Sequence, residues 1–285
     1  MIKKILVALD PDDDTPIATR YSADVAGRSG AEVSGLAIID TNRIAAEIGP
    51  GGAVGSMHYQ ETSRKRMLDE ARETARSLVH TFDETLEEAD LAHNEYVKEG
   101  SAIEQLLEEI KYNDLLVVGR SPHFFYNRPE KSTDTLARIV KHSIAPSLVV
   151  CERYEPVKHV LVAYDGSEPS ARTMHRFAQL QPFGTDLLVE IVYARTSDTS
   201  RQRDASNLLL ERASSYLRAH GFDHIRHSAV DGERPASSLI EHADRIHADM
   251  VVAGAHSVSA VRRVAFGSTT HELLTACMVP LFIFH

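Results

Sequence analysis

Small residues with a regular spacing occur near the C-terminus, between two short apolar runs. The runs, 250–253 and 279–284, are too short for helices and have the length of buried strands. Gly254 and Ser257 follow the first run, and Gly267, Ser268 and Thr269 precede a helix-like segment before the second. Small residues let a backbone approach a ligand, and the free N–H groups and dipole of a helix start favour an anion. The stretch therefore predicts a phosphate-binding site.

This spacing resembles the nucleotide loop of the universal stress protein family. The family pattern is Gly, two residues, Gly, nine residues, Gly and Ser or Thr, and here it reads Gly254, Ser257, Gly267 and Ser268. Serine in place of the second glycine is small and can donate a hydrogen bond, so we expect it to be tolerated unless that position needs a positive φ. The resemblance implies an adenine nucleotide as ligand, ATP or AMP, with or without Mg²⁺.

The elements that must position this loop occur twice along the chain. Residues 4–18 return as 159–173, residues 113–121 return as 248–256, and the apolar run 145–151 returns at 279–284. A chain of 285 residues is comfortable for two domains of this size. We therefore expect two tandem domains, 1–152 and 156–285.

Within each copy, apolar runs alternate with amphipathic segments. We predict strands near 2–9, 32–39, 92–98, 114–119, 147–151, 158–164, 186–194, 225–231, 249–254 and 279–284. We predict helices near 14–29, 60–84, 101–112, 132–143, 168–180, 200–220, 234–247 and 268–277. This alternation favours an α/β fold of two doubly wound, Rossmann-like domains, each with a five-stranded parallel sheet. The family resemblance implies the strand order 3-2-1-4-5.

In this arrangement the strand order reverses between the first and fourth strands. Ligands of such sheets bind at that point, beyond the carboxyl ends of the strands. In the second copy these ends carry Asp165 and Gly254. By resemblance, Asp165 accepts hydrogen bonds from hydroxyls or an amine of the adenosine, and Val192 lies beside the adenine unless the register slips by one. An alternative role for Asp165 is to cap the following helix.

The resemblance also distributes the small residues around the ligand. Gly254 and Ser257 flank the ribose and phosphates, while Gly267, Ser268 and Thr269 hold the phosphates. The pair 262–263, both arginine, either neutralises phosphate charge or is an exposed basic loop.

The first copy departs from this pattern. It has Asp10-Pro11-Asp12 where the second has Asp165-Gly166-Ser167, and Gly119, Pro122 and Ser132-Thr133 in its loop. Proline lacks an N–H, and the carboxylates at 12–14 would repel a triphosphate, so we expect this site to be lost. A solvated helix start explains those carboxylates better than a cation site.

Two further segments of the first copy stand out. The aromatic run 123–126, HFFY, could line an apolar pocket or seal the crevice, and packing against the other half or a second copy is the favoured interpretation. The glycine-rich run 49–55 carries no Gly-Lys-Ser/Thr and is interpreted as a plain loop rather than a lid.

Charge and composition exclude several classes of protein. The net charge of −10 argues against nucleic acid or an anionic membrane as partner, and no apolar stretch reaches the ~20 residues of a membrane span. Acidic residues follow the first apolar run directly, without a signal-peptide cleavage region, and two cysteines indicate a reducing compartment. We expect a cytoplasmic protein.

Catalytic and metal motifs give no positive signal. The pairs His224 and His227, and His242 and His247, are not spaced as metal ligands on a strand or helix. Walker, Gly-x-Ser-x-Gly and HExxH motifs are missing from the sequence. The sequence therefore predicts a nucleotide-binding stress-response regulator with no catalytic residues, the alternatives being a non-nucleotide interaction module or a slow ATPase. The halves are expected to pair through 148–150 and 281–283, and homodimer formation is left open.

Overall fold

In the computed structural model the strands of both halves form one continuous sheet. The structure describes residues 1–48, 54–122, 124, 133–195, 199–255 and 268–285. The strands are β1 (Lys4–Leu9), β2 (Glu32–Asp40), β3 (His93–Gly100), β4 (Leu115–Gly119), β5 (Ser147–Val150), β6 (His159–Ala163), β7 (Leu188–Arg195), β8 (Ile225–Asp231), β9 (Met250–Gly254) and β10 (Leu281–Phe284). Their order across the sheet is β3-β2-β1-β4-β5-β10-β9-β6-β7-β8. Each half thus has the order 3-2-1-4-5 that the resemblance implied.

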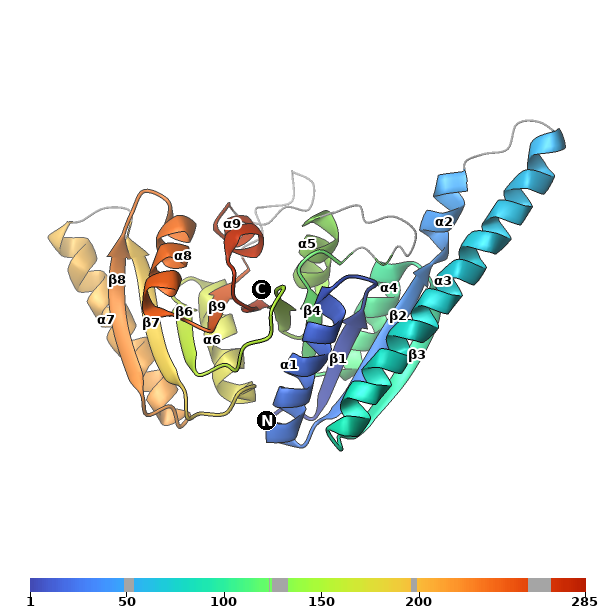
Figure 1. The fold of residues 1–285 in the computed structure, drawn as a ribbon. Coiled ribbons are helices and arrows are strands. Elements are labelled where there is room, and N and C mark those ends of the chain that lie inside the picture. The colour runs from blue at the N-terminus through green and yellow to red at the C-terminus, as the bar shows by residue number, and fades with distance from the viewer. Residues whose placement is uncertain (49–53, 123, 125–132, 196–198, 256–267) are drawn as a thin grey trace.

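Helices cover both faces of this sheet (Figure 1). They are α1 (Asp14–Ser29), α2 (Thr41–Ile48), α3 (Val54–Glu88), α4 (Ala102–Glu109), α5 (Thr133–His142), α6 (Glu168–Leu180), α7 (Ser200–Ala219), α8 (Pro235–Ile246) and α9 (Ser268–Ala276), with a 3₁₀ turn at Ile110–Tyr112. One core contains Tyr21 of α1 and Phe177 of α6, and the core on the opposite face contains Ile139 of α5 and Leu273 of α9. The α/β, doubly wound prediction is confirmed.

The two halves meet where β5 and β10 pair in antiparallel fashion. Leu148 lies opposite Phe282, and Val149 opposite Leu281. These are the strands expected to form the seam, and every other strand pair among the described residues is parallel. Backbone pairing at the seam removes the exposed edge that each half would have alone.

The connector between the halves also packs across the seam. The buried Tyr21 hydroxyl donates to the Glu155 carbonyl and accepts from the Glu155 N–H, both at 3.1 Å. The Tyr21 ring lies 4.8 Å from the Tyr154 ring and 6.3 Å from that of Phe183. First half, connector and second half are therefore joined on this face by two aromatic contacts of Tyr21.

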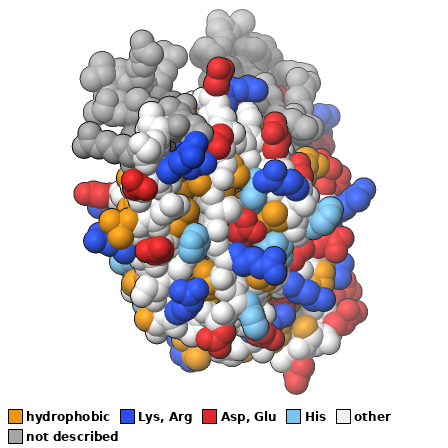
Figure 2. Space-filling view, turned by 90° about the vertical axis from the view of Figure 1, so that its left-hand side faces the viewer, with side chains coloured by type: hydrophobic (Ala, Val, Ile, Leu, Met, Phe, Trp, Pro, Cys, Tyr) orange, Lys and Arg blue, Asp and Glu red, His pale blue; other side chains and the backbone are white. Residues whose placement is uncertain are grey.

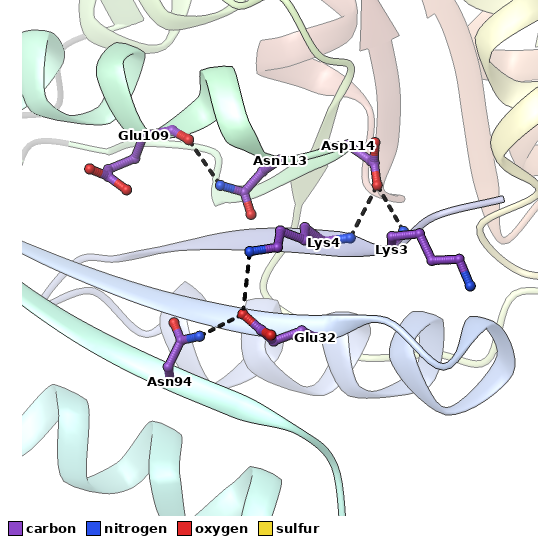
Figure 3. A network of polar contacts seen from close by, with 7 residues as sticks. All are labelled: Lys3, Lys4, Glu32, Asn94, Glu109, Asn113 and Asp114. Atoms are coloured by element: carbon purple, nitrogen blue, oxygen red, sulfur yellow. Dashed lines mark hydrogen bonds and ion pairs between the residues drawn. The ribbon is translucent and has the colours of Figure 1, made fainter.

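A carboxylate fixes the start of the central strand in each half. Asp114 accepts the backbone N–H groups of Lys3 and Lys4 at 2.8 and 3.1 Å, beside an ion pair between Lys4 and Glu32 (Figure 3). Asp249 accepts those of Lys158 and His159 at 2.9 and 2.8 Å. The repeated sequence thus produces the same local contact twice.

The first half differs from the second in one extended feature, the helices α2 and α3. α3 has 35 residues where α7 has 20, and it runs well beyond the sheet beside α2 (Figure 1). The prediction for this region was incomplete, because α2 was missed and α3 begins at Val54, so that the last two residues of the glycine-rich run 49–55 are helical. Residues 49–53 lie outside the described part of the chain.

The outer end of the second half is formed by β8 and its flanking helices. Figure 2 shows this end with acidic, basic and histidine side chains interspersed and apolar side chains scattered singly. Arg226 and His227 of β8 are both exposed. Charged side chains on an edge strand oppose pairing with another sheet. No helix within the described ranges is long and apolar enough to cross a membrane.

Candidate functional site

A cavity of about 440 Å³ opens in the second half, at the carboxyl ends of β6, β7 and β9. It is lined by residues of these strands and of the first turns of α6, α8 and α9: Ala163, Tyr164, Asp165, Ser167, Pro169, Ser170, Val192, Ala194, Pro235, Leu239, Ala253, Gly254, Ser268, Thr269, Thr270 and Leu273. Five of the seven residues singled out from the sequence are among them: Asp165, Val192, Gly254, Ser268 and Thr269. The other two, Ser257 and Gly267, lie outside the described residues, as do Arg262 and Arg263.

Asp165 lies at the end of β6, exposed at the cavity. Its Oδ1 accepts the backbone N–H of Ser167 at 2.9 Å. Partial desolvation acts to raise the pKa of Asp165, but hydrogen bonds from Ser167 and Ser170 outweigh it and the pKa is lowered. Asp165 is therefore an ionised hydrogen-bond acceptor at neutral pH.

The alternative interpretation made Asp165 the cap of α6, but the cap is a different residue. Ser167 is the N-cap residue, and its side chain accepts the N–H of Ser170. Between them Gly166 has φ +78°, a conformation that glycine adopts without strain and that the Pro11 of the first half cannot adopt. This turn brings the Asp165 carboxylate and the first turn of α6 to the same rim.

Gly254 ends β9 against the first turn of α6. A Cβ at this position would lie 2.5 Å from the Ser170 N and 2.6 Å from the Pro169 carbonyl carbon. The glycine was predicted for close approach to a ligand, and the structure shows that a close approach of two protein backbones also requires it.

The first turn of α9 forms the opposite rim. Ser268 is exposed, Thr269 is half-buried, and the buried Thr270 donates from Oγ1 to the Gly254 carbonyl at 3.4 Å. The first N–H groups of a helix have no intrahelical partner and carry the positive end of its dipole. This rim of the cavity therefore favours an anionic group.

The inner wall is apolar and comes from β7 and α8. Val192 is fully buried and its carbonyl accepts the Tyr164 N–H at 3.0 Å. Ala194, two residues further on the same sheet face, lines the cavity with Pro235 and Leu239 of α8. The α8 residues were not among the predicted site residues, because their approach to β7 is a tertiary contact that no spacing in the sequence indicates.

The corresponding crevice of the first half is filled. The strand pairing places Leu36 and Ile38 where the second half has Val192 and Ala194, and both are fully buried with Phe124 in one core cluster. The Phe124 N–H donates to Asp10 Oδ2 at 3.0 Å, so the counterpart of Asp165 binds protein backbone. At this residue the aromatic run enters the crevice, which is one of the alternatives the sequence left open; packing of the run against the other half or a second copy stays a prediction. Residues 123, 125 and 126 lie outside the described part.

A second cavity of about 740 Å³ lies at the seam, beside the acidic start of α1. Asp14 accepts the backbone N–H of Arg120 at 3.1 Å, and desolvation raises the pKa of Asp14. The Arg120 side chain donates to Cys151 Sγ at 2.8 Å and to the Cys277 carbonyl. Burial raises the pKa of the Cys151 thiol to about 12. In the described part of the chain, no three His, Cys, Asp or Glu side chains are placed to share a metal ion.

Comparisons with known proteins agree with this architecture. The model of the universal stress protein family matches residues 1–150 and again residues 156–285. The universal stress protein Slr1230 of Synechocystis sp. (strain PCC 6803) is 23% identical over 293 residues, covering 99% of this chain and all of that protein. A universal stress protein structure from Archaeoglobus fulgidus has a TM-score of 0.64 at 15% identity, covering 99% of this chain and 95% of the other.

A shorter structure, a universal stress protein in complex with cAMP, covers 46% of this chain and 98% of its own, with 24% identity and a TM-score of 0.39. The nucleotide is a ligand of that protein. Because the family model matches both halves, this chain belongs to the universal stress protein family and carries two tandem domains of it.

Proposed function

We propose that the second half binds an adenine nucleotide, ATP or AMP, with or without Mg²⁺, and that the protein is a stress-response regulator through this site. The observation that carries the proposal is the cavity of about 440 Å³, in which the described residues predicted for the nucleotide lie together. They come from separate segments between 165 and 269, so only the fold unites them.

The chemistry of the lining suits a molecule with a flat apolar end and an anionic end. Val192, Ala194 and Leu239 offer apolar contact for a base, and the ionised Asp165 accepts hydrogen bonds from ribose hydroxyls. Ser268 and Thr269, in the first turn of α9, line the cavity, and the start of a helix favours phosphate oxygens. In this proposal the first half binds no nucleotide, because Leu36, Ile38 and Phe124 occupy the equivalent space.

Copying the filled crevice into the open one tests the function. The double variant Val192→Leu, Ala194→Ile places the first half's residues at the matched positions of the second, so the fold already tolerates them once. A matched control is Ala229→Ile, which makes the same Ala→Ile change as at position 194 but on the neighbouring strand β8, on the opposite sheet face.

Mass spectrometry of small molecules released from the purified protein, and calorimetric titration with ATP and AMP, provide the measurement. We expect nucleotide binding by the wild type and the control, and loss of binding in the double variant. If the wild type binds neither nucleotide, or if the double variant binds as well as the wild type, the proposed function is wrong.

A further inference from the structure

A groove of about 420 Å³ lies on the surface of the second half, between α6 and the end of β10. This α6 groove is lined by Arg172, His175, Arg176, Gln179 and Phe284. The four residues from α6 are all exposed and are spaced by three or four positions, so they form one stripe along the helix. The groove shares no described lining residue with the nucleotide cavity, so it is a separate surface.

The counterpart of this stripe on α1 is covered by the connector between the halves. Continued along the helix, the internal repeat relates residues 20–21 to residues 175–176. The centre of the Tyr154 ring lies 4.4 Å from the guanidinium carbon of Arg20 and 4.8 Å from the centre of the Tyr21 ring. Tyr21 is fully buried, whereas its counterpart Arg176 is exposed. The molecule thus holds an occupied and an open copy of one surface, and the occupied copy binds a non-helical segment with an aromatic side chain.

The open copy has a surplus of positive charge. Arg172 and Arg176 lie four residues apart on one helix face, a spacing at which like charges repel. Arg172 pairs with Glu168 at 3.2 Å, but the two side chains are 57% and 85% exposed, and so open a pair contributes little to stability. Within the described ranges Arg176 makes no ion pair, and its guanidinium carbon lies 5.8 Å from the centre of the Phe284 ring. A carboxylate from outside the chain would relieve the repulsion between the two guanidiniums.

Neighbouring side chains add to this positive charge. Burial lowers the pKa of His285, which follows Phe284, and the positive charges of Arg172 and His142 lower it further. Lys141 and His142 form the basic last turn of α5. Because the whole chain has a net charge of −10, this is a local reversal of the overall charge, and it favours an acidic ligand.

Two aromatic rings of the groove are held in place by the protein itself. The His175 ring packs on the Tyr216 ring of α7, with 4.2 Å between the centres and 12° between the planes, while the His175 side chain stays exposed. Thr173 donates from Oγ1 to the Phe284 carbonyl at 2.9 Å and so fixes the backbone beside the second ring. Surfaces ordered before a ligand arrives lower the entropy cost of binding.

We propose that the α6 groove binds an acidic, non-helical segment of a partner protein that carries an aromatic side chain among its carboxylates. The aromatic ring stacks on His175 and Arg176, as Tyr154 does on their counterparts in α1. The carboxylates pair with Arg172 and Arg176, and the Gln179 amide bonds to the backbone of the segment. This binding is independent of the nucleotide function proposed above.

NMR titration with three synthetic peptides, EEYEE, KKYKK and EEAEE, tests the chemistry of the occupant. We expect EEYEE to bind at least about tenfold more tightly than KKYKK, with an affinity that falls as salt is added. EEAEE should bind about threefold more weakly than EEYEE, because it lacks the ring that stacks on an exposed cation. Equal affinities of EEYEE and EEAEE would overturn the stacking on His175 and Arg176.

Substitution of the two arginines tests the place of binding. The double variant Arg172→Gln, Arg176→Gln should bind EEYEE about tenfold more weakly, the combined effect of two exposed ion pairs. The matched control Arg66→Gln, Arg76→Gln removes the same charge from exposed side chains of α3 and should bind like the wild type. All four side chains are exposed, so both variants are expected to fold.

Amide chemical shifts locate the peptide directly. Shifts along α6 and at Phe284 should move, and those around Tyr154 and α1 should not, because that copy of the surface is covered. If the groove variant binds EEYEE as well as the wild type does, if KKYKK binds as tightly as EEYEE, or if the shifts move elsewhere, the proposal is wrong.

A second copy of this chain is the competing occupant of the groove. Sedimentation equilibrium of the wild type and of both double variants decides between the two, and we expect the same state of association for all three. Self-association of the wild type that is lost in the Arg172→Gln, Arg176→Gln variant would assign the groove to a second copy and overturn the assignment to a partner protein.

Discussion

At the scale of single residues, the two halves show how one position constrains its neighbours. Gly254 allows β9 to approach the backbone of α6, and the matched Gly119 allows β4 to approach Asp14, whose Cβ would lie 2.8 Å from an added Cβ. The neighbour is rigid backbone in one half and a side chain in the other. The two matched glycines therefore differ in how well they tolerate substitution by a residue with a Cβ.

Gly254→Ala should destabilise the protein by roughly 1–3 kcal/mol or more, because the Pro169 and Ser170 backbone atoms cannot move away from the new Cβ. Gly27→Ala is the matched control, since its Cβ would meet nothing within 4 Å inside α1 and it should stabilise that helix by about 1 kcal/mol. Urea unfolding followed by circular dichroism compares them. Equal effects of the two substitutions would contradict the packing described at Gly254.

The lowered pKa of Glu190 gives a pH dependence of stability with a definite sign. Desolvation opposes the shift, and hydrogen bonds from Ser228 and His242 produce it. A carboxyl whose pKa is lower in the folded than in the unfolded state adds stability above the unfolded value of about 4.3, and that stability is lost as the pH falls through the folded value. Glu190→Gln should therefore flatten the acid side of the unfolding profile.

Chemical unfolding at a series of pH values checks this prediction. Glu233→Gln, which neutralises an exposed carboxyl, should keep the wild-type profile. If the stability of Glu190→Gln fell as steeply with decreasing pH as that of the wild type, the proposed contribution of Glu190 would be wrong.

At the scale of elements, most of the fold could be predicted because local patterns suffice for it. In the described part of the chain, all ten strands and the longer helices follow from apolar runs and amphipathic spacing, with ends shifted by a few residues. The missed helix α2 had a local signal: Asp40 Oδ1 accepts the Arg43 N–H at 3.0 Å, a capping contact, and Ile44 and Ile48 follow with helical spacing. The α8 side of the cavity had none, since Leu239 reaches Val192 only through the packing of α8 on β7.

Phe124 lies in the crevice of the first half that corresponds to the open cavity of the second half. It is fully buried with φ 50°, and Phe124→Ala should destabilise the protein by about 3–5 kcal/mol through the void that it leaves in the core cluster that contains Leu36 and Ile38. Calorimetric unfolding would measure the loss of stability, and the stability of Phe124→Leu is expected to lie between those of the wild type and Phe124→Ala. A Phe124→Ala variant as stable as the wild type would show that the side chain does not fill the first crevice.

At the scale of the whole molecule, the seam is held by strands, connector and side chains together. β5 and β10 supply the backbone pairing, Arg120 reaches the Cys277 carbonyl from the first half, and Tyr21 binds the connector at Glu155. Because the Tyr21 hydroxyl both donates and accepts at Glu155, its removal leaves two backbone groups without this partner.

Tyr21→Phe should therefore cost roughly 1–3 kcal/mol while the ring contacts with Tyr154 and Phe183 persist. Tyr112→Phe removes a hydroxyl from a side chain that is 69% exposed and should have little effect. Thermal unfolding of both variants, with hydrogen exchange at β5 and β10, compares the two. Unchanged exchange at the seam in Tyr21→Phe would show that the connector does not stabilise it.

The joining of β5 to β10 within one chain has a consequence for how the two halves can vary. In a symmetric pair of identical chains every substitution occurs on both sides of the interface, and dilution separates the partners. Here neither holds, because the partners are covalently tethered at a fixed effective concentration. One half can exchange ligand-binding residues for packing residues, as Phe124, Leu36 and Ile38 illustrate, while it continues to supply the strand on which the other half depends.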